Sequence, residues 1–198
     1  MKLVLASGSA SRRAMLEAAG VPFDVVRPAV DEEAAKASLA AAGTAPRDTA
    51  DALAQLKALR VSNAYPQALV LGSDSVVELD DGTLLDKPET REVAADHLRR
   101  MSGRSHRLHS AAVIAEGGRP VWREVDTVTL FVRPLGATFV ETYLDAEWPA
   151  IAGCVGCFRI EGPGAQLFVR IDGSQFTVLG LPLLPVLDYL RVRGVLAS

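Results

Sequence analysis

The sequence has little of what marks several large classes of protein. Its 198 residues include two cysteines, three histidines and 6% aromatic residues, and the formal net charge is −3. Because basic residues are not in excess, we expect no nucleic-acid partner. No run is long and apolar enough to span a membrane, and residues 1–10 lack the apolar core of a signal peptide. We therefore expect a cytoplasmic protein with no membrane partner.

The cysteines and histidines form no recognisable metal or redox motif. Cys154 and Cys157 make one isolated C-x-x-C pair, whereas a zinc site needs two further ligands at suitable spacing. The pair lies late in the chain among glycines, unlike the early pair of thioredoxin-like proteins. We expect both cysteines to be small loop or core residues. His97, His106 and His109 have no ligand-spaced partners and are expected to be structural, with His97 on the polar face of a helix.

The motifs of two common nucleotide-binding folds are absent as well. The chain has neither a Walker A loop nor a G-x-G-x-x-G sequence, which disfavours P-loop and Rossmann chemistry. Strand-like and helix-like segments nevertheless alternate along its whole length, which is typical of an α/β fold. A chain of 198 residues suits one domain, or two lobes that share a sheet.

The hydrophobic pattern predicts individual elements. Strands are expected over residues 3–6, 23–26, 68–77, 83–85, 105–115, 121–132, 168–171 and 176–179. Helices are expected after the first serine-rich loop up to Gly20 and over residues 50–61, 90–101, 137–146 and 182–192. Residues 35–47 are rich in alanine and are expected to form a loop or a frayed helix.

The most informative segment is residues 5–13, which reads Leu-Ala-Ser-Gly-Ser-Ala-Ser-Arg-Arg. It predicts a strand, a tight loop and the start of a helix, where outward-pointing backbone N–H groups attract anions. Ser7 and Ser9 add hydroxyl donors, and Arg12 or Arg13 adds a planar fork suited to phosphate oxygens. Taken alone, such a segment is more often a solvated helix start with two surface arginines.

Three further polar clusters interrupt apolar segments or lie at their ends. Asp31 and Glu32 follow a short strand, and Asp74 lies inside the apolar strand 68–77. A carboxylate in a buried strand is costly unless it is paired, hydrogen-bonded or bound to a cation, although it could also cap a neighbouring loop. Lys87, in Asp-Lys-Pro, suits a phosphate group or is an ordinary surface lysine.

Together these clusters supply carboxylates for a divalent cation and basic groups for a polyphosphate. Mg²⁺ typically takes one or two carboxylates plus substrate phosphates, and a carboxylate can also deprotonate an attacking water. The residues therefore favour metal-assisted attack on a phosphate anhydride.

The same residues form a series of motifs that resembles the Maf family of nucleoside triphosphate pyrophosphatases, historically described as septum formation inhibitors. The motifs run through nearly the whole chain in one order: Leu-Ala-Ser-x-Ser-x-x-Arg from Leu5, Gly-Ser-Asp-x-Val-Val from Gly72, Lys87-Pro88, Ser102-Gly103-x-x-His106, Ala152-Gly153, Gly156, Glu161-Gly162 and Gly180-Leu181-Pro182-Leu183.

The resemblance implies one Maf-like domain over residues 1–198, related in fold to inosine triphosphatases, with an elongated mixed sheet, flanking helices and a cleft between two lobes. It also implies release of pyrophosphate from a noncanonical or modified nucleotide with a divalent cation, Mg²⁺ or Mn²⁺. Asp74 would accept the proton and, with Glu32, hold the metal. The other residues that the motifs assign to the phosphate and metal site are Ser7, Arg12, Lys57 and Lys87. A homodimer is expected from the same resemblance.

Subfamily choice among Maf proteins falls at Ser11, Ser75 and Glu161 of this chain. As far as the resemblance implies, proteins of the dTTP/UTP type have Arg, Thr and Gln at these positions, and those of the 7-methyl-GTP type have Trp, Gln and Glu. Glu161 agrees with the second type, because a carboxylate accepts hydrogen bonds from both N1–H and the 2-amino group of guanine. Ser11 and Ser75 match neither type.

Two departures from the family pattern bear on this choice. Ser11 offers no aromatic face for a methylated base, and Trp148 or Phe158 would have to substitute. Leu56 stands where the family commonly has a glutamate before the lysine. The expected function is hydrolysis of a 7-methyl-GTP-like nucleotide. The alternatives are a dTTP/UTP pyrophosphatase and a nucleotide-binding regulator of cell division with weak or no catalysis.

Overall fold

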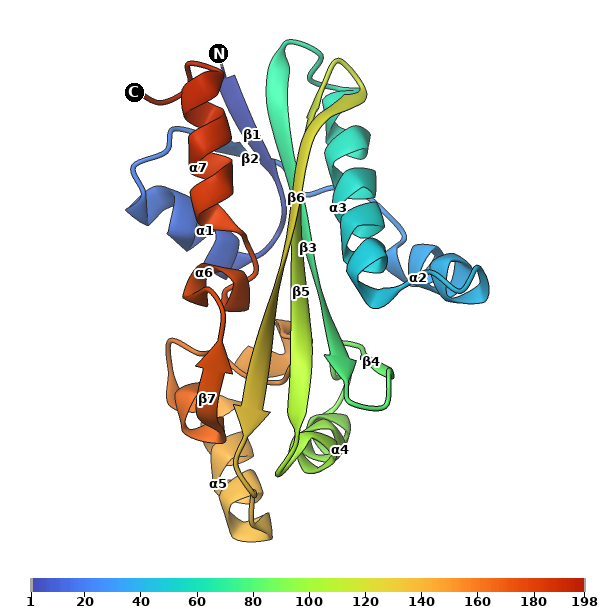
Figure 1. The fold of residues 1–198 in the computed structure, drawn as a ribbon, viewed down its shortest axis with the longest axis vertical. Helices are drawn as coiled ribbons and strands as arrows, with labels where there is room; N and C mark the ends of the chain where they lie inside the picture. The colour runs from blue at the N-terminus through green and yellow to red at the C-terminus, as the bar shows by residue number, and fades with distance from the viewer. Residues whose placement is uncertain (1, 198) are drawn as a thin grey trace. The chain divides into compact units, whose positions relative to one another are not determined.

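The computed structural model describes residues 2–197 as an α/β protein with a seven-stranded mixed sheet (Figure 1). The strand order is β2-β1-β3-β5-β6-β7, and β4 pairs with β3 outside this path. Strand β1 is parallel to β2 and β3, whereas β4 and β7 run antiparallel to their neighbours. The strands are β1 (Lys2–Ala6), β2 (Asp24–Val25), β3 (Ala68–Leu79), β4 (Leu84–Leu85), β5 (Ser105–Glu116), β6 (Arg119–Val132) and β7 (Phe168–Asp172). The predicted α/β class is confirmed.

Seven α-helices and two 3-10 helices lie between or after these strands within residues 2–197. They are α1 (Ala10–Ala18), α2 (Glu32–Ala41), α3 (Pro46–Ser62), α4 (Arg91–Met101), α5 (Ala137–Glu147), η1 (Ala150–Gly153), η2 (Pro163–Leu167), α6 (Gln175–Val178) and α7 (Leu183–Val192). None of the helices in this part of the chain is both long enough and apolar enough to cross a membrane.

Two sequence predictions of local structure are wrong. Residues 176–179 form no strand; most of them belong to α6, a single turn in which the Leu179 N–H bonds to the Gln175 carbonyl. Their aromatic and β-branched side chains favour a strand, but a run this short packs equally well as one helical turn. The alanine-rich stretch is also better ordered than expected. Helix α2 covers most of it, and the Asp31 side chain caps that helix by accepting the Ala34 N–H at 2.9 Å.

The chain forms two compact units. The first comprises Met1–Ser75, Ser110–Asp126 and Gln175–Ser198, and the second comprises Val76–His109 and Thr127–Ser174. Strands β3, β5 and β6 each contribute residues to both units. The single domain over residues 1–198 that the resemblance implies stays a prediction.

In the first unit, helices cover both faces of the sheet, α1 and α7 on one side and α3 on the other (Figure 1). Strand alternation sorts the core between these faces, because successive side chains point in opposite directions. The odd-numbered Leu3, Leu5, Leu69 and Leu71 pack in one cluster with Leu16 of α1 and Val186 of α7. The even-numbered Val4, Ala6, Ala68 and Val70 pack in a second cluster with Val61 of α3.

Helix α3 approaches strand β3 unusually closely at Gly72. A Cβ atom there would overlap the Ala54 carbonyl oxygen and would lie 2.5 Å from the Ala58 backbone nitrogen. Only glycine leaves room for the helix backbone at this point, and Ala54 and Ala58 are themselves small. The close approach brings Lys57, which lies between Ala54 and Ala58 in the helix, within reach of Asp74 in the strand.

We expect Gly72→Ala to destabilise the protein by about 1–3 kcal/mol, because the added methyl group overpacks the contact with α3. Denaturant unfolding monitored by circular dichroism measures the change. Gly136→Ala is the control, since a Cβ there meets nothing within 4 Å and φ is −73°. Equal stability of the two variants would contradict the close packing at Gly72.

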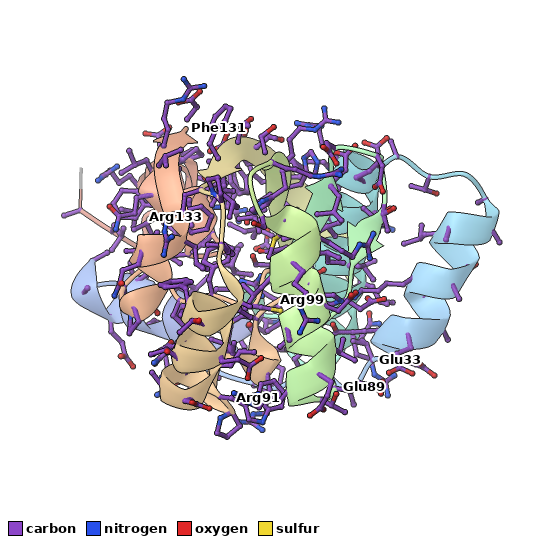
Figure 2. The ribbon with its side chains drawn as sticks, turned by 90° about the horizontal axis from the view of Figure 1, so that it is seen from below. Glu33, Glu89, Arg91, Arg99, Phe131 and Arg133 are labelled. Atoms are coloured by element: carbon purple, nitrogen blue, oxygen red, sulfur yellow. The ribbon has the colours of Figure 1, made fainter. Side chains whose placement is uncertain are left out.

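The second unit is stabilised by contacts between α4 and α5 and by a buried aromatic cluster. Arg91 of α4, labelled in Figure 2, forms ion pairs with Glu141 and Asp145 of α5 at 2.9 and 2.6 Å. His97 does not lie on a polar face as predicted. It is only 8% exposed, and its Nδ1 lies 3.5 Å from the Cys157 sulfur, because α4 turns this face toward the interior.

His106 lies in the aromatic cluster of the second unit without a hydrogen-bond partner on either ring nitrogen among the described residues. It contacts Phe158 and Phe168, which pack edge to face with a centroid separation of 4.8 Å. Burial lowers the pKa of His106 from its usual 6.5 to about 4. The neutral ring is therefore favoured in the folded protein.

This burial predicts part of the acid sensitivity of the fold. The unfolded chain takes up a proton at His106 below pH 6.5, and the folded chain does so only near pH 4, so stability falls as pH drops through this interval. We expect His106→Phe to remove about 3 kcal/mol of the stability difference between pH 7 and pH 4. Denaturant titrations of both proteins at several pH values measure this. An unchanged pH dependence in the variant would contradict a buried neutral imidazole.

Candidate active site

The first part of the site lies where strand β1 ends beside strand β3. Their pairing runs from Lys2 opposite Ala68 to Ala6 opposite Gly72, and the chain then turns through residues 7–9 into α1. Ser9 caps α1 by accepting the Arg12 N–H at 3.4 Å. The Ser7 hydroxyl oxygen accepts from the Ser9 N–H at 3.1 Å, so its proton remains able to bond to an anionic oxygen.

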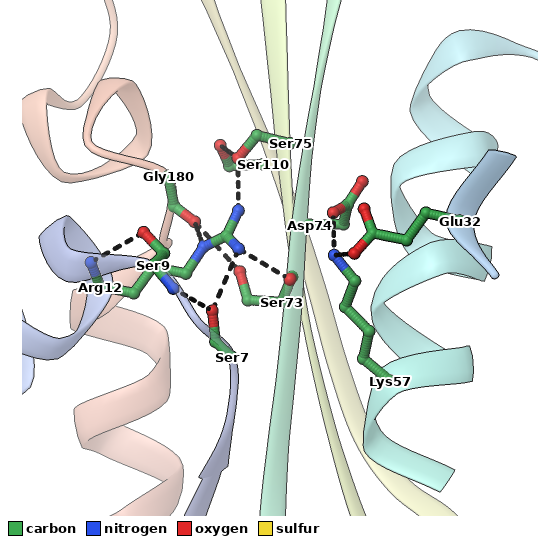
Figure 3. A network of polar contacts seen from close by, with 10 residues as sticks. All are labelled: Ser7, Ser9, Arg12, Glu32, Lys57, Ser73, Asp74, Ser75, Ser110 and Gly180. Atoms are coloured by element: carbon green, nitrogen blue, oxygen red, sulfur yellow. Dashed lines mark hydrogen bonds and ion pairs between the residues drawn. The ribbon is translucent and has the colours of Figure 1, made fainter. Parts of the chain in front are cut away.

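Beyond this point, residues 73–75 of β3 have no β1 residue opposite them, and their side chains alternate between the two faces (Figure 3). Ser73 and Ser75 point toward α1 and the segment that precedes α7. Asp74 points toward α3 and is only 6% exposed. The predicted buried carboxylate is therefore present, and it has a charged partner.

That partner is Lys57 of α3, whose ammonium lies between two carboxylates (Figure 3). Its Nζ lies 2.6 Å from Asp74 Oδ1 and 3.0 Å from Glu32 Oε1. Lys57 is 5% exposed, and it lies on the same face of α3 as the buried Leu53 and Val61. Three predicted site residues thus meet at one point.

Arg12 is buried on the other side of β3 and is held by protein oxygens. Its Nε donates to the Gly180 carbonyl at 2.7 Å, and its Nη1 donates to the Ser73 carbonyl at 2.9 Å. The Nη2 donates to the Ser75 hydroxyl at 2.9 Å. Burial lowers the pKa of the Arg12 guanidinium, and the negative charges of Asp74 and Glu32 oppose that shift.

The remaining basic and small residues near the serine loop are more exposed. Arg13 is exposed and lies 3.6 Å from Glu17 within α1, while Ser11 is half-buried. Arg27, which the sequence analysis missed, places its side chain against Gly8 in the loop. Its only sequence signal is its place just after β2, the strand that pairs with β1.

Two predicted site residues, Lys87 and Glu161, belong to the second unit and are exposed. Both lie near the half-buried Cys154. Burial raises the pKa of the Cys154 thiol, Glu161 adds to that shift, and Arg159 and Lys87 oppose it.

Burial also raises the pKa of Cys157 to about 12, so this thiol is not poised as a nucleophile. Phe158 is committed to the aromatic cluster with His106 and Phe168, and Trp148 is half-buried.

The two carboxylates that contact Lys57 are of the type that a divalent cation takes. Asp74 Oδ1 and Glu32 Oε1 converge on one positive charge, and carboxylate oxygens are the ligands that Mg²⁺ and Mn²⁺ prefer. Among residues 2–197, no group of three or more His, Cys, Asp or Glu side chains is arranged to hold a metal ion. A cation here would use these two carboxylates and complete its shell with water or substrate phosphates, as Mg²⁺ commonly does.

Known proteins are similar to this chain over most of its length. A family model described as "Maf-like protein" matches residues 2–193. A nucleoside triphosphate pyrophosphatase of Sphingopyxis alaskensis is 51% identical over 195 residues, covering 98% of each chain. A protein of the same name from Hyphomonas neptunium is 50% identical over 198 residues, covering 100% of this chain and 99% of its own.

Among solved structures, a HAM1 protein from Coxiella burnetii matches 67% of this chain and 73% of its own, at 15% identity and a TM-score of 0.46, a likeness too low to inform the fold. The family match and the two bacterial relatives each extend over nearly the whole sequence. The motifs that carry the predicted resemblance lie within this matched region. The chain belongs to the Maf family.

Proposed function

We propose that this chain is a nucleoside triphosphate pyrophosphatase whose reaction centres on Asp74, Glu32 and Lys57. The observation that carries the proposal is the convergence of two carboxylates on one buried ammonium beside the end of β1. Family membership supports the reaction class, since the relatives named above are nucleoside triphosphate pyrophosphatases. Water attacks the triphosphate, the α–β anhydride bond breaks, and pyrophosphate leaves with the nucleoside monophosphate as the other product.

In this proposal Asp74 takes the proton of the attacking water, while Asp74 and Glu32 provide the ligands for Mg²⁺ or Mn²⁺. When bound, such a cation would offset negative charge on the phosphates. Lys57 supplies positive charge at the same place. The hydroxyls of Ser7 and Ser9, the start of α1 and the side chains of Arg12, Arg13 and Lys87 are assigned to phosphate oxygens.

Arg27 is a further residue that we assign to the phosphates, because its guanidine group lies against Gly8 of the serine loop. A cation beside a loop that follows a strand and precedes a helix adds to the positive field of the helix start. The proposal therefore includes one basic residue that the family motifs do not supply.

For the base, we propose a guanine-type nucleotide similar to 7-methyl-GTP, with Glu161 as the reader and with Ser11 and Ser75 at the other two selecting positions. The carboxylate of Glu161 matches the two neighbouring donors of guanine, whereas uracil and thymine offer one N–H flanked by two carbonyls. The alternative functions are a dTTP/UTP pyrophosphatase and a nucleotide-binding regulator of cell division with weak or no catalysis. The homodimer and the cytoplasmic location stay predictions.

We expect Asp74→Asn to lower kcat by roughly two to four orders of magnitude while the fold is retained, because the near-isosteric amide cannot act as a base. Pyrophosphate release from a panel of triphosphates, with Mg²⁺ or Mn²⁺, measures this. Asp188→Asn, at an exposed position of α7, is the matched control and should keep wild-type turnover. A folded Asp74→Asn protein with normal turnover would overturn the proposed role of Asp74. A wild-type protein with no turnover on any triphosphate would favour the regulator.

We expect Glu161→Gln to move preference away from guanine nucleotides and toward dTTP and UTP, because an amide offers one donor and one acceptor. The ratio of kcat/KM values should change by about tenfold or more, since a mismatched polar group discriminates strongly. Measuring kcat/KM for 7-methyl-GTP, GTP, dTTP and UTP on both proteins decides the matter. Glu124→Gln, in β6 of the first unit, is the control. A ratio unmoved by Glu161→Gln would show that this residue does not read the base.

A further inference from the structure

A chain of hydrogen bonds in the first unit begins at Arg12 and ends at the backbone of α6. Figure 3 shows its part from Arg12 to Ser110. Arg12 Nη2 donates to the Ser75 hydroxyl at 2.9 Å, and the Ser75 and Ser110 hydroxyl oxygens lie 2.8 Å apart. The Ser110 hydroxyl in turn donates to the Thr177 carbonyl at 2.9 Å. Four residues from α1, β3, β5 and α6 are thus joined in one line.

The direction of every bond in this chain is fixed. Ser110 has a single hydroxyl proton, and it donates this proton in a hydrogen bond to the Thr177 carbonyl, because a carbonyl can only accept. Ser75 must therefore donate to Ser110, and its oxygen accepts from the Arg12 guanidinium. All the donors point the same way, an arrangement in which each bond polarises and strengthens the next.

A second set of contacts joins Gly180, which follows α6, to α1 and β3. The Gly180 carbonyl accepts from Arg12 Nε at 2.7 Å and from the Ser73 hydroxyl at 3.0 Å. At Gly180 φ is +98°, and a Cβ there would lie 3.2 Å from the Ser75 hydroxyl oxygen. Residues 177–180 are therefore attached to both neighbours of Asp74 in β3, Ser73 and Ser75.

We infer that Ser110 is a positioning residue for the reaction: through Ser75 and Arg12, it fixes the part of β3 that carries Asp74. This inference rests on the proposed role of Asp74. Ser110 is fully buried, and its hydroxyl bonds to Ser75 and to the Thr177 carbonyl, so it acts on the reaction only through them. Without its hydroxyl, the Ser75 proton loses its acceptor and the Thr177 carbonyl keeps only the Gly180 N–H at 3.0 Å, so residues 73–75 are held less firmly. Displacements of about 1 Å in a catalytic group can lower turnover strongly.

The test is a double-mutant cycle of Ser110→Ala and Ser75→Ala, measured as kcat and KM for pyrophosphate release. We expect each single variant to lower kcat by about tenfold, and the double variant to fall no more than about twofold further, because both substitutions break the same chain. The KM of Ser110→Ala should stay within about threefold of wild type, because Ser110 itself does not contact substrate and Arg12 keeps its bonds to the Gly180 and Ser73 carbonyls in this variant.

Two companion variants separate positioning from a general loss of stability. Ser62→Ala removes another fully buried serine hydroxyl of the first unit, one that accepts the Gly118 N–H at 3.0 Å, and should leave kcat within about twofold of wild type. Ser75→Thr keeps the hydroxyl at a half-buried position and should recover most of the turnover lost in Ser75→Ala, measured with the same nucleotide. If Ser110→Ala does not fold, the comparison of Ser75→Ala with Ser75→Thr carries the test.

Additive losses in the cycle, a loss in Ser62→Ala equal to that in Ser110→Ala, or no recovery in Ser75→Thr would each overturn the inference. Asp74→Asn separates this outcome from failure of the proposed function. If Asp74→Asn is inactive while the cycle is additive, only the positioning role of Ser110 is wrong. If Asp74→Asn is fully active, the proposed site itself is wrong.

Discussion

The ammonium of Lys57, held between Asp74 and Glu32, is the interaction on which the site depends. A buried carboxylate in the middle of an apolar strand is costly unless it is paired, and Asp74 is paired at 2.6 Å. Removing one partner from such a pair commonly costs about 3–5 kcal/mol, because the other charge is left buried and uncompensated. The pair in turn requires α3 to lie close to β3, which Gly72 permits because it has no side chain.

Strand β1 ends opposite Gly72, and the cluster around Lys57 and the Arg12 side chain both contact β3 just beyond that point. Asp74 faces α3 and Ser75 faces α1, on opposite faces of β3. If β1 continued along β3 at this point, the sheet would separate the two side chains completely. Because β1 stops opposite Gly72, the edge of residues 73–75 is next to the serine loop and the start of α1. Ligands of open α/β sheets commonly bind at such carboxyl ends of strands. A phosphate chain at this edge would meet hydroxyls, helix-terminal N–H groups and the cluster around Lys57.

The sequence predicts the fold and part of the site for identifiable reasons. Asp74 is conspicuous because it interrupts an apolar strand. Burying an unpaired carboxylate is costly, so the sequence already indicates a partner for it, among other possibilities. Lys57 came only from the family motif, although a signal was present, since it stands four residues from both Leu53 and Val61 on one buried helix face. The burial of Arg12 could not be read from the sequence, because its main partner, Gly180, is 168 residues away. Residues 176–179 were assigned to a strand, since one helical turn has no periodicity to recognise.

We propose that Glu32 and Asp74 hold the cation and that the serine loop receives the phosphates. A crystal structure with Mn²⁺ and a non-hydrolysable triphosphate analogue tests both assignments, because anomalous scattering locates the manganese. We expect manganese bound by Asp74 and Glu32, the Lys57 ammonium moved away from at least one of these carboxylates, and phosphate oxygens at the Ser7 hydroxyl. Manganese bound by other side chains, or a triphosphate remote from residues 7–9, would contradict it.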